Sequence, residues 1–279
     1  MATRVRVAVL GVGSLGQQHA RIYAEMHRQE AVELVGVYDT DPAQAKAIAE
    51  KHDTTALGSI EAAAAAADAL SIVTPTVTHH TLAKPLLELG KHLLVEKPMT
   101  DNAAQAAELV SLAKRHDCVL QVGHIERFNP VFNYLQQAAR EPRFIESHRL
   151  SPFPARSMDI GVVLDLMIHD LDIVLAFVRS PVEHVDAAGV RVLSESEDIA
   201  NARLRFANGC VANLTVSRVS PESLRKIRVV SGGDEPGYVS LDYREQKGYH
   251  YRLARDDEQE SSMLKKIFAG KDSAIVSQF

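Results

Sequence analysis

The sequence predicts two domains: an α/β domain with a doubly wound parallel sheet, followed by an α+β domain with a mostly antiparallel open sheet. Three observations predict this division. Short β-rich runs alternate with helical patterns up to about Gly123, strand-like segments dominate after Phe144, and 279 residues are enough for two domains. We therefore expect domains at 1–123 and 124–279.

The first half has the pattern of βαβ units around a parallel sheet. The expected strands are Val5–Leu10, Glu33–Tyr38, Ala69–Val73, His92–Val95 and Val119–Val122, and the expected helices are Leu15–Arg28, Pro42–Lys51, Thr78–Leu89 and Asn102–His116. Asp41 before Pro42 predicts an N-cap followed by proline at the first helical position. The alanines at 62–67 extend one helix, because alanine is the best helix former.

The second half changes to strands. One helical stretch, Leu164–Val178, is followed by strand candidates at His184–Val192, Ile199–Phe206, Val211–Val216, Ile227–Val230 and Tyr238–Tyr243. Glycine turns at Asn208-Gly209 and Gly232-Gly233 are typical of hairpins, so a mostly antiparallel sheet is expected.

Composition indicates which kinds of partner and which cellular location to expect. A formal net charge of -5 gives no basic excess for nucleic acid or an anionic membrane, so small molecules are the expected partners. Cys118 and Cys210 have no CxxC spacing, which predicts two reduced, buried thiols rather than disulfides or a zinc site. The apolar run Val5–Leu10 is too short for a signal sequence, and the cytoplasm is the expected location.

A glycine motif marks the expected cofactor site. Gly11-Val-Gly13-Ser14-Leu15-Gly16 follows a predicted strand and opens a helix. In that position glycines permit the tight turn, the approach of a pyrophosphate to the helix N-terminus, and close helix–strand packing. The alternative is a glycine-rich turn without a ligand, which the strand context disfavours.

Asp39 indicates which dinucleotide binds. It ends the second predicted strand, 23 residues after Gly16, where a carboxylate can accept hydrogen bonds from both adenosine ribose hydroxyls. The 2′-phosphate of NADP would meet Asp39 and Asp41 as like charge, so NAD is the expected cofactor. A capping or turn role is the alternative, and it suits Asp41 better than Asp39.

Two further segments are expected at the carboxyl edge of this sheet, where doubly wound folds bind ligands. Glu96-Lys97-Pro98 ends the strand His92–Val95, and Thr74, Pro75 and His79 follow the preceding strand and are expected near the cofactor. The Lys97 ammonium is a candidate donor to the reacting hydroxyl, stabilising alkoxide character. The alternative is an ordinary surface lysine.

Asp165, His169 and Asp172 share one face of the predicted helix in the second domain. Histidine can take a hydroxyl proton near neutral pH, and a carboxylate one turn away can orient it or bind a substrate hydroxyl. One alternative is a hydrogen-bonded pair that only fixes helix packing. Another is a metal site, but no further ligand is identifiable and we predict none.

The motifs together resemble the glucose–fructose oxidoreductase/inositol dehydrogenase/rhizopine catabolism (Gfo/Idh/MocA) family. They are Gly11–Gly16, Asp39, Glu96-Lys97-Pro98, Gly123-His124-Ile-Glu-Arg127-Phe128-Asn129-Pro130 and Gly161-x-x-x-Asp165-x-x-x-His169-Asp-Leu-Asp172. The resemblance implies a Rossmann domain, an open-faced substrate domain, Lys97 and His169 as catalytic residues with Asp165 beside them, and a cis bond before Pro98. It also implies a further carboxy-terminal helix, so we expect a shortened chain.

Within the family, the stretches Gly123–Phe132 and Ser157–Ile173 are similar to members that oxidise the 3-hydroxyl of UDP-N-acetylglucosamine. Arg127, Arg149 and Arg156 are candidates to bind the substrate diphosphate through forked guanidinium contacts, with Asn129 also at the substrate site. Each arginine has the alternative of an ordinary surface or interdomain role.

The resemblance leaves two other functions open. One is a glycoside hydrolase that recycles its NAD, and the other is a non-catalytic NAD-binding regulator. The open sheet is expected to pair two copies of the chain, giving a homodimer or a homotetramer.

Overall fold

The computed structural model describes residues 4–153, 160–234, 236–253, 264–269 and 272–278. The chain divides into two compact units, Met1–Gly123 and His124–Phe279. Within the described part of the chain, no helix has the length and apolar character needed to cross a membrane.

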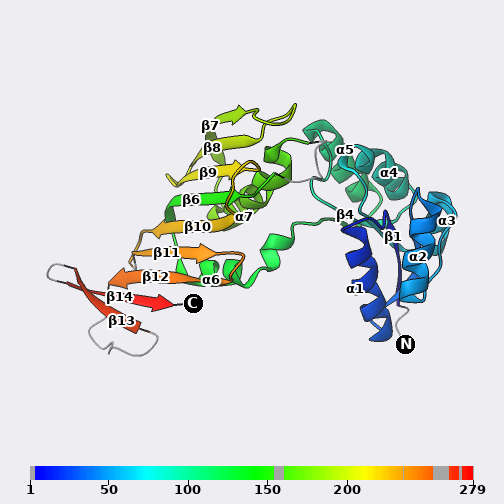
Figure 1. Cartoon of the computed structure of the whole chain (residues 1–279), viewed down its shortest axis with the longest axis horizontal. Coiled ribbons are helices and arrows are strands. Elements are labelled where there is room, and N and C mark those ends of the chain that lie inside the picture. Colours follow the sequence, from blue (N-terminus) through cyan, green and yellow to red (C-terminus); the bar gives the residue numbers. More distant parts are fainter. Residues whose placement is uncertain (1–3, 154–159, 235, 254–263, 270–271, 279) are drawn as a thin grey trace. The chain divides into compact units, whose positions relative to one another are not determined.

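The first unit is a five-stranded parallel sheet with the order β2-β1-β3-β4-β5 (Figure 1). Its strands are β1 (Val5–Leu10), β2 (Val32–Tyr38), β3 (Ala69–Ile72), β4 (His92–Val95) and β5 (Leu120–Val122). Its helices are α1 (Gly16–Arg28), α2 (Pro42–His52), α3 (Ile60–Ala66), α4 (Thr76–Glu88) and α5 (Ala103–Arg115). This is the expected doubly wound arrangement, and the predicted N-cap at Asp41 is confirmed by its bonds to the Ala43 and Gln44 amides.

Alternating side chains of β1 build the core on both faces of this sheet. Val9 packs in a cluster with residues of α1 and α2. Ala8 and Leu10 belong to another cluster, with residues of α3, α4 and α5. The strand is therefore buried on both faces from Val7 to Leu10, which explains why these four residues are all apolar. The order reverses between β1 and β3, so a crevice is expected beyond the ends of these two strands.

The second unit is a nine-stranded sheet with the order β13-β14-β12-β11-β10-β6-β9-β8-β7. Its strands are β6 (Pro142–Leu150), β7 (Val182–Val190), β8 (Ile199–Phe206), β9 (Val211–Ser217), β10 (Leu224–Ser231), β11 (Gly237–Asp242), β12 (Lys247–Leu253), β13 (Leu264–Ala269) and β14 (Asp272–Gln278). Among the described strands of this sheet, only the pairing of β6 with β9 is parallel. The sheet is therefore mostly antiparallel, as predicted.

The helical segments of this unit are η1 (Ile125–Phe128), α6 (Pro130–Ala138), η2 (Val163–Met167) and α7 (Ile168–Val178). Helices α6 and α7 lie against one face of the sheet (Figure 1), and their side chains Leu135 and Ile173 belong to the same buried cluster as Ile145 and Leu214 of the strands. One face of the central strands is thus covered, and that face carries the core of the unit.

The sequence missed several elements of the second unit. The central strand β6 was not predicted, because Arg143, Glu146, His148 and Arg149 make it strongly polar. The predicted helix 164–178 begins with one π-helical turn, η2, rather than a regular α-helix. The carboxy-terminal polar stretch contributes β13 and β14. Of the two expected buried thiols, Cys210 is buried and Cys118 only partly so, and both are free.

Candidate functional site

The glycine loop of the first unit has the geometry that a dinucleotide needs. Gly11 has a φ of +83°, and a Cβ there would lie 2.6 Å from the Val73 carbonyl oxygen. A Cβ on Gly16 would collide with the Gly11 carbonyl. At Gly13, in contrast, a Cβ would meet nothing within 4 Å. Gly11 and Gly16 are thus required by packing, whereas Gly13 leaves open space over the loop.

A pocket of about 530 Å³ lies beyond β1 and β3, in the first unit. It is lined by the following residues: Leu10, Gly11, Gly13, Tyr38, Asp39, Thr40, Ile60, Val73, Thr74, Pro75, Thr78, Thr81 and Leu82. Five of the predicted cofactor residues, Gly11, Gly13, Asp39, Thr74 and Pro75, are therefore brought together. Ser14 and Leu15 lie exposed in the turn before α1.

The Asp39 carboxylate is fixed at one side of this pocket. Its Oδ2 accepts the Val12 amide at 2.8 Å, and its Oδ1 accepts the Asp41 amide at 3.0 Å. Each oxygen keeps a second lone pair for a hydroxyl donor. No lysine or arginine lines the pocket among the described residues. The open glycine loop, the oriented carboxylate and the lack of a cation fit NAD.

The Glu96-Lys97-Pro98 segment follows β4. Glu96 is buried and is held by the ring of His19, 3.1 Å from its Oε1, and by the Lys97 amide, which donates to Oε2. The Lys97–Pro98 peptide bond is cis, as the family resemblance implied. Glu96 was predicted at the cofactor site, and its carboxylate is engaged inside the unit by His19 and by the Lys97 amide.

His79 joins two sides of the expected cofactor site. Its side chain is only 1% exposed. Its Nδ1 lies 2.9 Å from the Pro98 carbonyl oxygen, and its Nε2 lies 2.9 Å from that of Thr74. The ring therefore connects the pocket wall at Thr74 to the turn after Lys97. Both ring nitrogens of His79 are thus within hydrogen-bond distance of a backbone carbonyl oxygen.

In the second unit, two carboxylates near His169 are engaged in ion pairs. Asp170 is buried and accepts the Arg149 Nε at 2.8 Å and the Ser147 hydroxyl at 2.9 Å. Asp172 accepts the Arg127 guanidinium, with its Oδ2 2.7 Å from Nε. Asp165 and His169 are partly exposed on η2 and α7. The helix is thus held by the two aspartates that follow His169.

Arg149 is the centre of a buried charged cluster. It is 3% exposed and also donates from NH1 to Glu126 Oε1 at 3.0 Å. Burial alone would lower the pKa of Arg149, but the two carboxylates outweigh it and raise the pKa. Burial raises the pKa of the neighbouring Tyr243 well above its ordinary value. Arg149 is therefore engaged by two carboxylates within the unit, and it does not lie at the surface as its predicted alternative would have it.

The other predicted substrate residues differ in their exposure and in their hydrogen-bond partners. Arg127 is bound to Asp172, whose hydrogen bond raises the pKa of Arg127, but its side chain is 49% exposed. Asn129 caps α6 through the Val131 amide and donates to the Glu126 carboxylate and the Tyr243 carbonyl. Arg156 lies outside the described residues.

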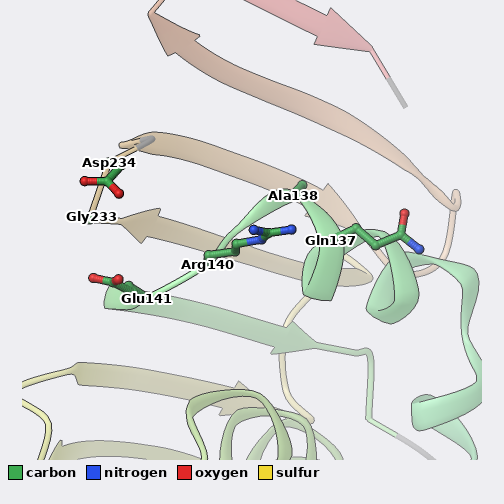
Figure 2. Close-up of a pocket in the computed structure, with 7 residues that line it drawn as sticks. Gln137, Ala138, Arg140, Glu141, Gly233 and Asp234 are labelled. Carbon is green, nitrogen blue, oxygen red and sulfur yellow. The ribbon is translucent and has the colours of Figure 1, made fainter.

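A second hollow of about 580 Å³ lies in the second unit (Figure 2), between the end of α6 and the turn that joins β10 to β11. It is lined by Gln137, Ala138, Arg140, Glu141, Gly232, Gly233 and Asp234, none of which was predicted as a site residue. No group of three histidine, cysteine, aspartate or glutamate side chains is arranged for a metal within the part of the chain that the structure describes.

Both units match models of one protein family. Residues 5–124 match the model described as "Oxidoreductase family, NAD-binding Rossmann fold", and residues 137–232 match the "GFO/IDH/MocA C-terminal domain". The chain belongs to the GFO/IDH/MocA oxidoreductase family. The first unit is accordingly an NAD-binding domain, and the relatives within the family are named dehydrogenases or oxidoreductases.

Individual relatives match across both units. The UDP-N-acetylglucosamine 3-dehydrogenase of Acidithiobacillus ferrooxidans is 40% identical over 240 residues, which cover 86% of this chain and 74% of that protein. A solved structure of that enzyme superimposes with a TM-score of 0.83, covering 93% of this chain and 85% of the other at 38% identity. The scyllo-inositol 2-dehydrogenase (NAD(+)) of Bacillus subtilis is 27% identical over 79% of this chain and 69% of its own.

Proposed function

We propose that this GFO/IDH/MocA protein oxidises the 3-hydroxyl of UDP-N-acetylglucosamine, or of a related nucleotide sugar, to a ketone with NAD. The observation that carries the proposal is the 40% identity to the Acidithiobacillus ferrooxidans enzyme over 86% of the chain, because the match extends through both units. Inositol dehydrogenases are less similar, at 31% identity or below.

The residues that would hold the cofactor lie in the first unit. The Gly11, Gly13 and Gly16 loop, with Ser14 and Leu15, would bind the pyrophosphate, and Asp39 would bind the adenosine ribose. Thr74 and Pro75 would form the opposite wall of the pocket. When bound, NAD supplies the hydride acceptor.

Three side chains would perform the proton chemistry. The Lys97 ammonium would donate a hydrogen bond to the reacting hydroxyl and stabilise its developing negative charge. His169 would accept the hydroxyl proton as general base, with Asp165 orienting the ring or the substrate. Oxidation then converts the C–H and O–H of the sugar carbon into a carbonyl, releasing one hydride and one proton.

Recognition of the diphosphate is proposed for Arg127. Two of its N–H groups are used by Asp172, and the exposed part of the guanidinium retains further donors. Arg156 and Asn129 stay proposals for the substrate site, with Asn129 also serving as the α6 cap.

The test is NADH formation, followed by absorbance, when the protein and NAD meet UDP-N-acetylglucosamine or a panel of simple sugars and polyols. Lys97→Ala and His169→Asn are expected to lower kcat by about 100-fold or more. The exposed Lys114→Ala and His184→Asn are matched controls and should retain activity.

Each alternative outcome is distinct. A free sugar formed without net NADH would refute the proposal and support an NAD-recycling hydrolase. Tight NAD binding with no turnover of any sugar would support a regulatory role.

We also propose that the protein forms a homodimer or homotetramer through the open face of the second-unit sheet, and that it acts in the cytoplasm. The open face presents a row of apolar and aromatic side chains paired across neighbouring strands, Phe144, Val230, Tyr238 and Tyr251. Sedimentation analysis of the wild type and of Tyr238→Glu tests the interface, because a buried glutamate would dissociate it.

A further inference from the structure

The helix that carries Asp165 and His169 begins without a capping side chain of its own. The residue before η2 is Val162, which provides no side-chain hydrogen bond. The first amides of a helix lack intrahelical partners and need acceptors from elsewhere. Here both acceptors come from Glu197: its carbonyl accepts the Val162 amide at 3.0 Å, and its carboxylate Oε1 accepts the Val163 amide at 3.2 Å.

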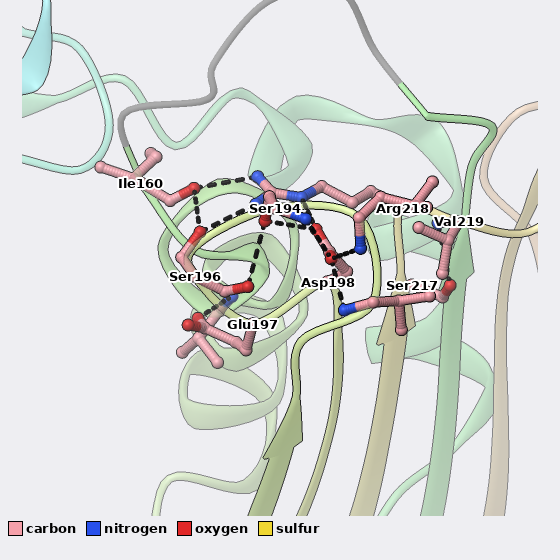
Figure 3. A network of polar contacts seen from close by, with 11 residues as sticks. Ile160, Ser194, Ser196, Glu197, Asp198, Ser217, Arg218 and Val219 are labelled. Carbon is pink, nitrogen blue, oxygen red and sulfur yellow. Dashed lines mark hydrogen bonds and ion pairs between the residues drawn. The ribbon is translucent and has the colours of Figure 1, made fainter.

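Glu197 belongs to the 191–198 loop between β7 and β8, which is held by a buried ion pair (Figure 3). Asp198 and Arg218 are both 0% exposed, and the Arg218 Nε lies 2.8 Å from the Asp198 Oδ1. Asp198 Oδ2 accepts the amides of Val192, Leu193 and Ser194. Burial alone would raise the pKa of Asp198, but hydrogen bonds from the Ser194 hydroxyl, from Arg218 and from the loop amides lower it, so the carboxylate stays charged.

The same ion pair reaches the segment before the helix. Arg218 NH1 donates to the Ile160 carbonyl at 2.9 Å, and NH2 donates to the hydroxyls of Ser194 and Ser196 at 2.8 Å. Figure 3 shows Arg218 between Ile160 and the loop, with Glu197 beside them. The loop and residue 160 are thus fixed to one buried charge.

Gly161 leaves the space that Glu197 occupies. A Cβ built on Gly161 would collide with the Glu197 carboxylate, whose Cδ and both oxygens fill that position. The glycine of the Gly161-x-x-x-Asp165 motif is therefore explained by the close approach of a side chain to the backbone, rather than by contact with a ligand.

We propose that Glu197 is a positioning residue for catalysis: it caps the start of the helix that carries Asp165 and His169, and the Asp198–Arg218 pair holds it there. A carboxylate at a helix N-terminus satisfies orphan amides and interacts favourably with the helix dipole. This proposal rests on the proposed function for the roles of Asp165 and His169. It does not rest on that function for the cap itself.

The first experiment uses Glu197→Ala, Glu197→Gln and, as a matched control in the same loop, the exposed Glu195→Ala. Glu197→Ala is expected to speed hydrogen exchange of the amides at 162–166 by about tenfold and to lower kcat by about 10- to 100-fold. The KM for NAD should not change, because the cofactor residues lie in the first unit. Glu197→Gln keeps an oxygen acceptor, so its hydrogen exchange and its kcat should both lie close to the wild-type values.

The second experiment is a double-mutant cycle with Gly161→Ala. The added methyl group should displace the Glu197 carboxylate and reproduce the exchange and kcat changes of Glu197→Ala. In the Glu197→Ala background the methyl group finds the space left by the carboxylate, so Gly161→Ala should add little.

Two results would overturn the proposal: a Glu197→Ala variant that matches Glu195→Ala in exchange and kcat, or fully additive effects in the cycle. If the wild type oxidises no sugar, the proposed function fails. Exchange at 162–166 and the ring NMR shifts of His169 in Glu197→Ala then decide whether Glu197 sets the position of the helix. Variants of Asp198 and Arg218 are avoided, because breaking a buried ion pair endangers folding.

Discussion

The Asp39 carboxylate sets the expected discrimination between NAD and NADP. Both oxygens already accept one backbone amide, from Val12 and Asp41, so the group is oriented before the cofactor binds. Hydrogen bonds to a charged group contribute about 1.5–3 kcal/mol each. Losing two ribose hydrogen bonds, partly replaced by water, is expected to cost Asp39→Ala about 3 kcal/mol, or roughly 100-fold in the Kd for NAD.

Asp39→Ala is expected to change the Kd for NADP differently from the Kd for NAD. The 2′-phosphate is repelled by the wild-type carboxylate, so its removal offsets the lost hydrogen bond and leaves the Kd for NADP nearly constant or lower. Titration calorimetry with both dinucleotides measures the two constants. Asp39→Asn keeps one oxygen acceptor, so its Kd for NAD should lie between those of the wild type and Asp39→Ala. Glu50→Gln, on the exposed side of α2, controls for the change in net charge. Equal losses for NAD and NADP, or an unchanged Kd for NAD, would refute the reasoning.

Two further predictions concern stability. Arg149→Leu should lower the free energy of unfolding by about 3–5 kcal/mol in urea titrations, because it removes the buried cation that Glu126 and Asp170 share. Arg225→Leu, an exposed arginine 3.9 Å from one of them, should cost under about 1 kcal/mol, and equal losses would contradict this explanation. Hydrogen bonds from Arg6 lower the pKa of Asp68 from 3.8 to about 2. The stability from Asp68 is thus complete above about pH 4 and lost as the pH falls toward 2. The pair is exposed, so Asp68→Asn should remove no more than about 1 kcal/mol of stability at neutral pH and flatten the acid limb of the unfolding curve.

The first unit could be predicted almost completely from its sequence. Its central strands are largely buried and therefore contain apolar runs such as Val7–Leu10, and its loops carry local signals such as the Asp41-Pro42 helix start. The glycine motif and Asp39 fall in one pocket because they follow neighbouring strands of a parallel sheet, an arrangement that topology alone imposes.

The second unit was predicted less well because its polar residues interact over long distances. Arg149 on β6 was considered for a substrate diphosphate, but its partners are Glu126 and Asp170, more than 20 positions away. The importance of Glu197 and Arg218 was missed for the same reason. Their signal was present in the Ser-Glu-Ser-Glu-Asp run at 194–198, where serine and aspartate can bind nearby amides. Arg218, the buried cation that pairs with Asp198 of this run, could not be identified without the fold.

The parallel pairing of β6 with β9 has a consequence for the order of folding. β7, β8 and β9 can form as successive neighbours along the chain, and so can β10, β11 and β12. Among the described strands, these two groups join only through β6, which precedes both and pairs with residues 67 to 89 positions later. A nascent chain leaving the ribosome can therefore complete the first unit early, whereas the second must keep β6 unpaired until β9 and β10 have emerged. Chaperone binding during synthesis is expected to concentrate on that interval.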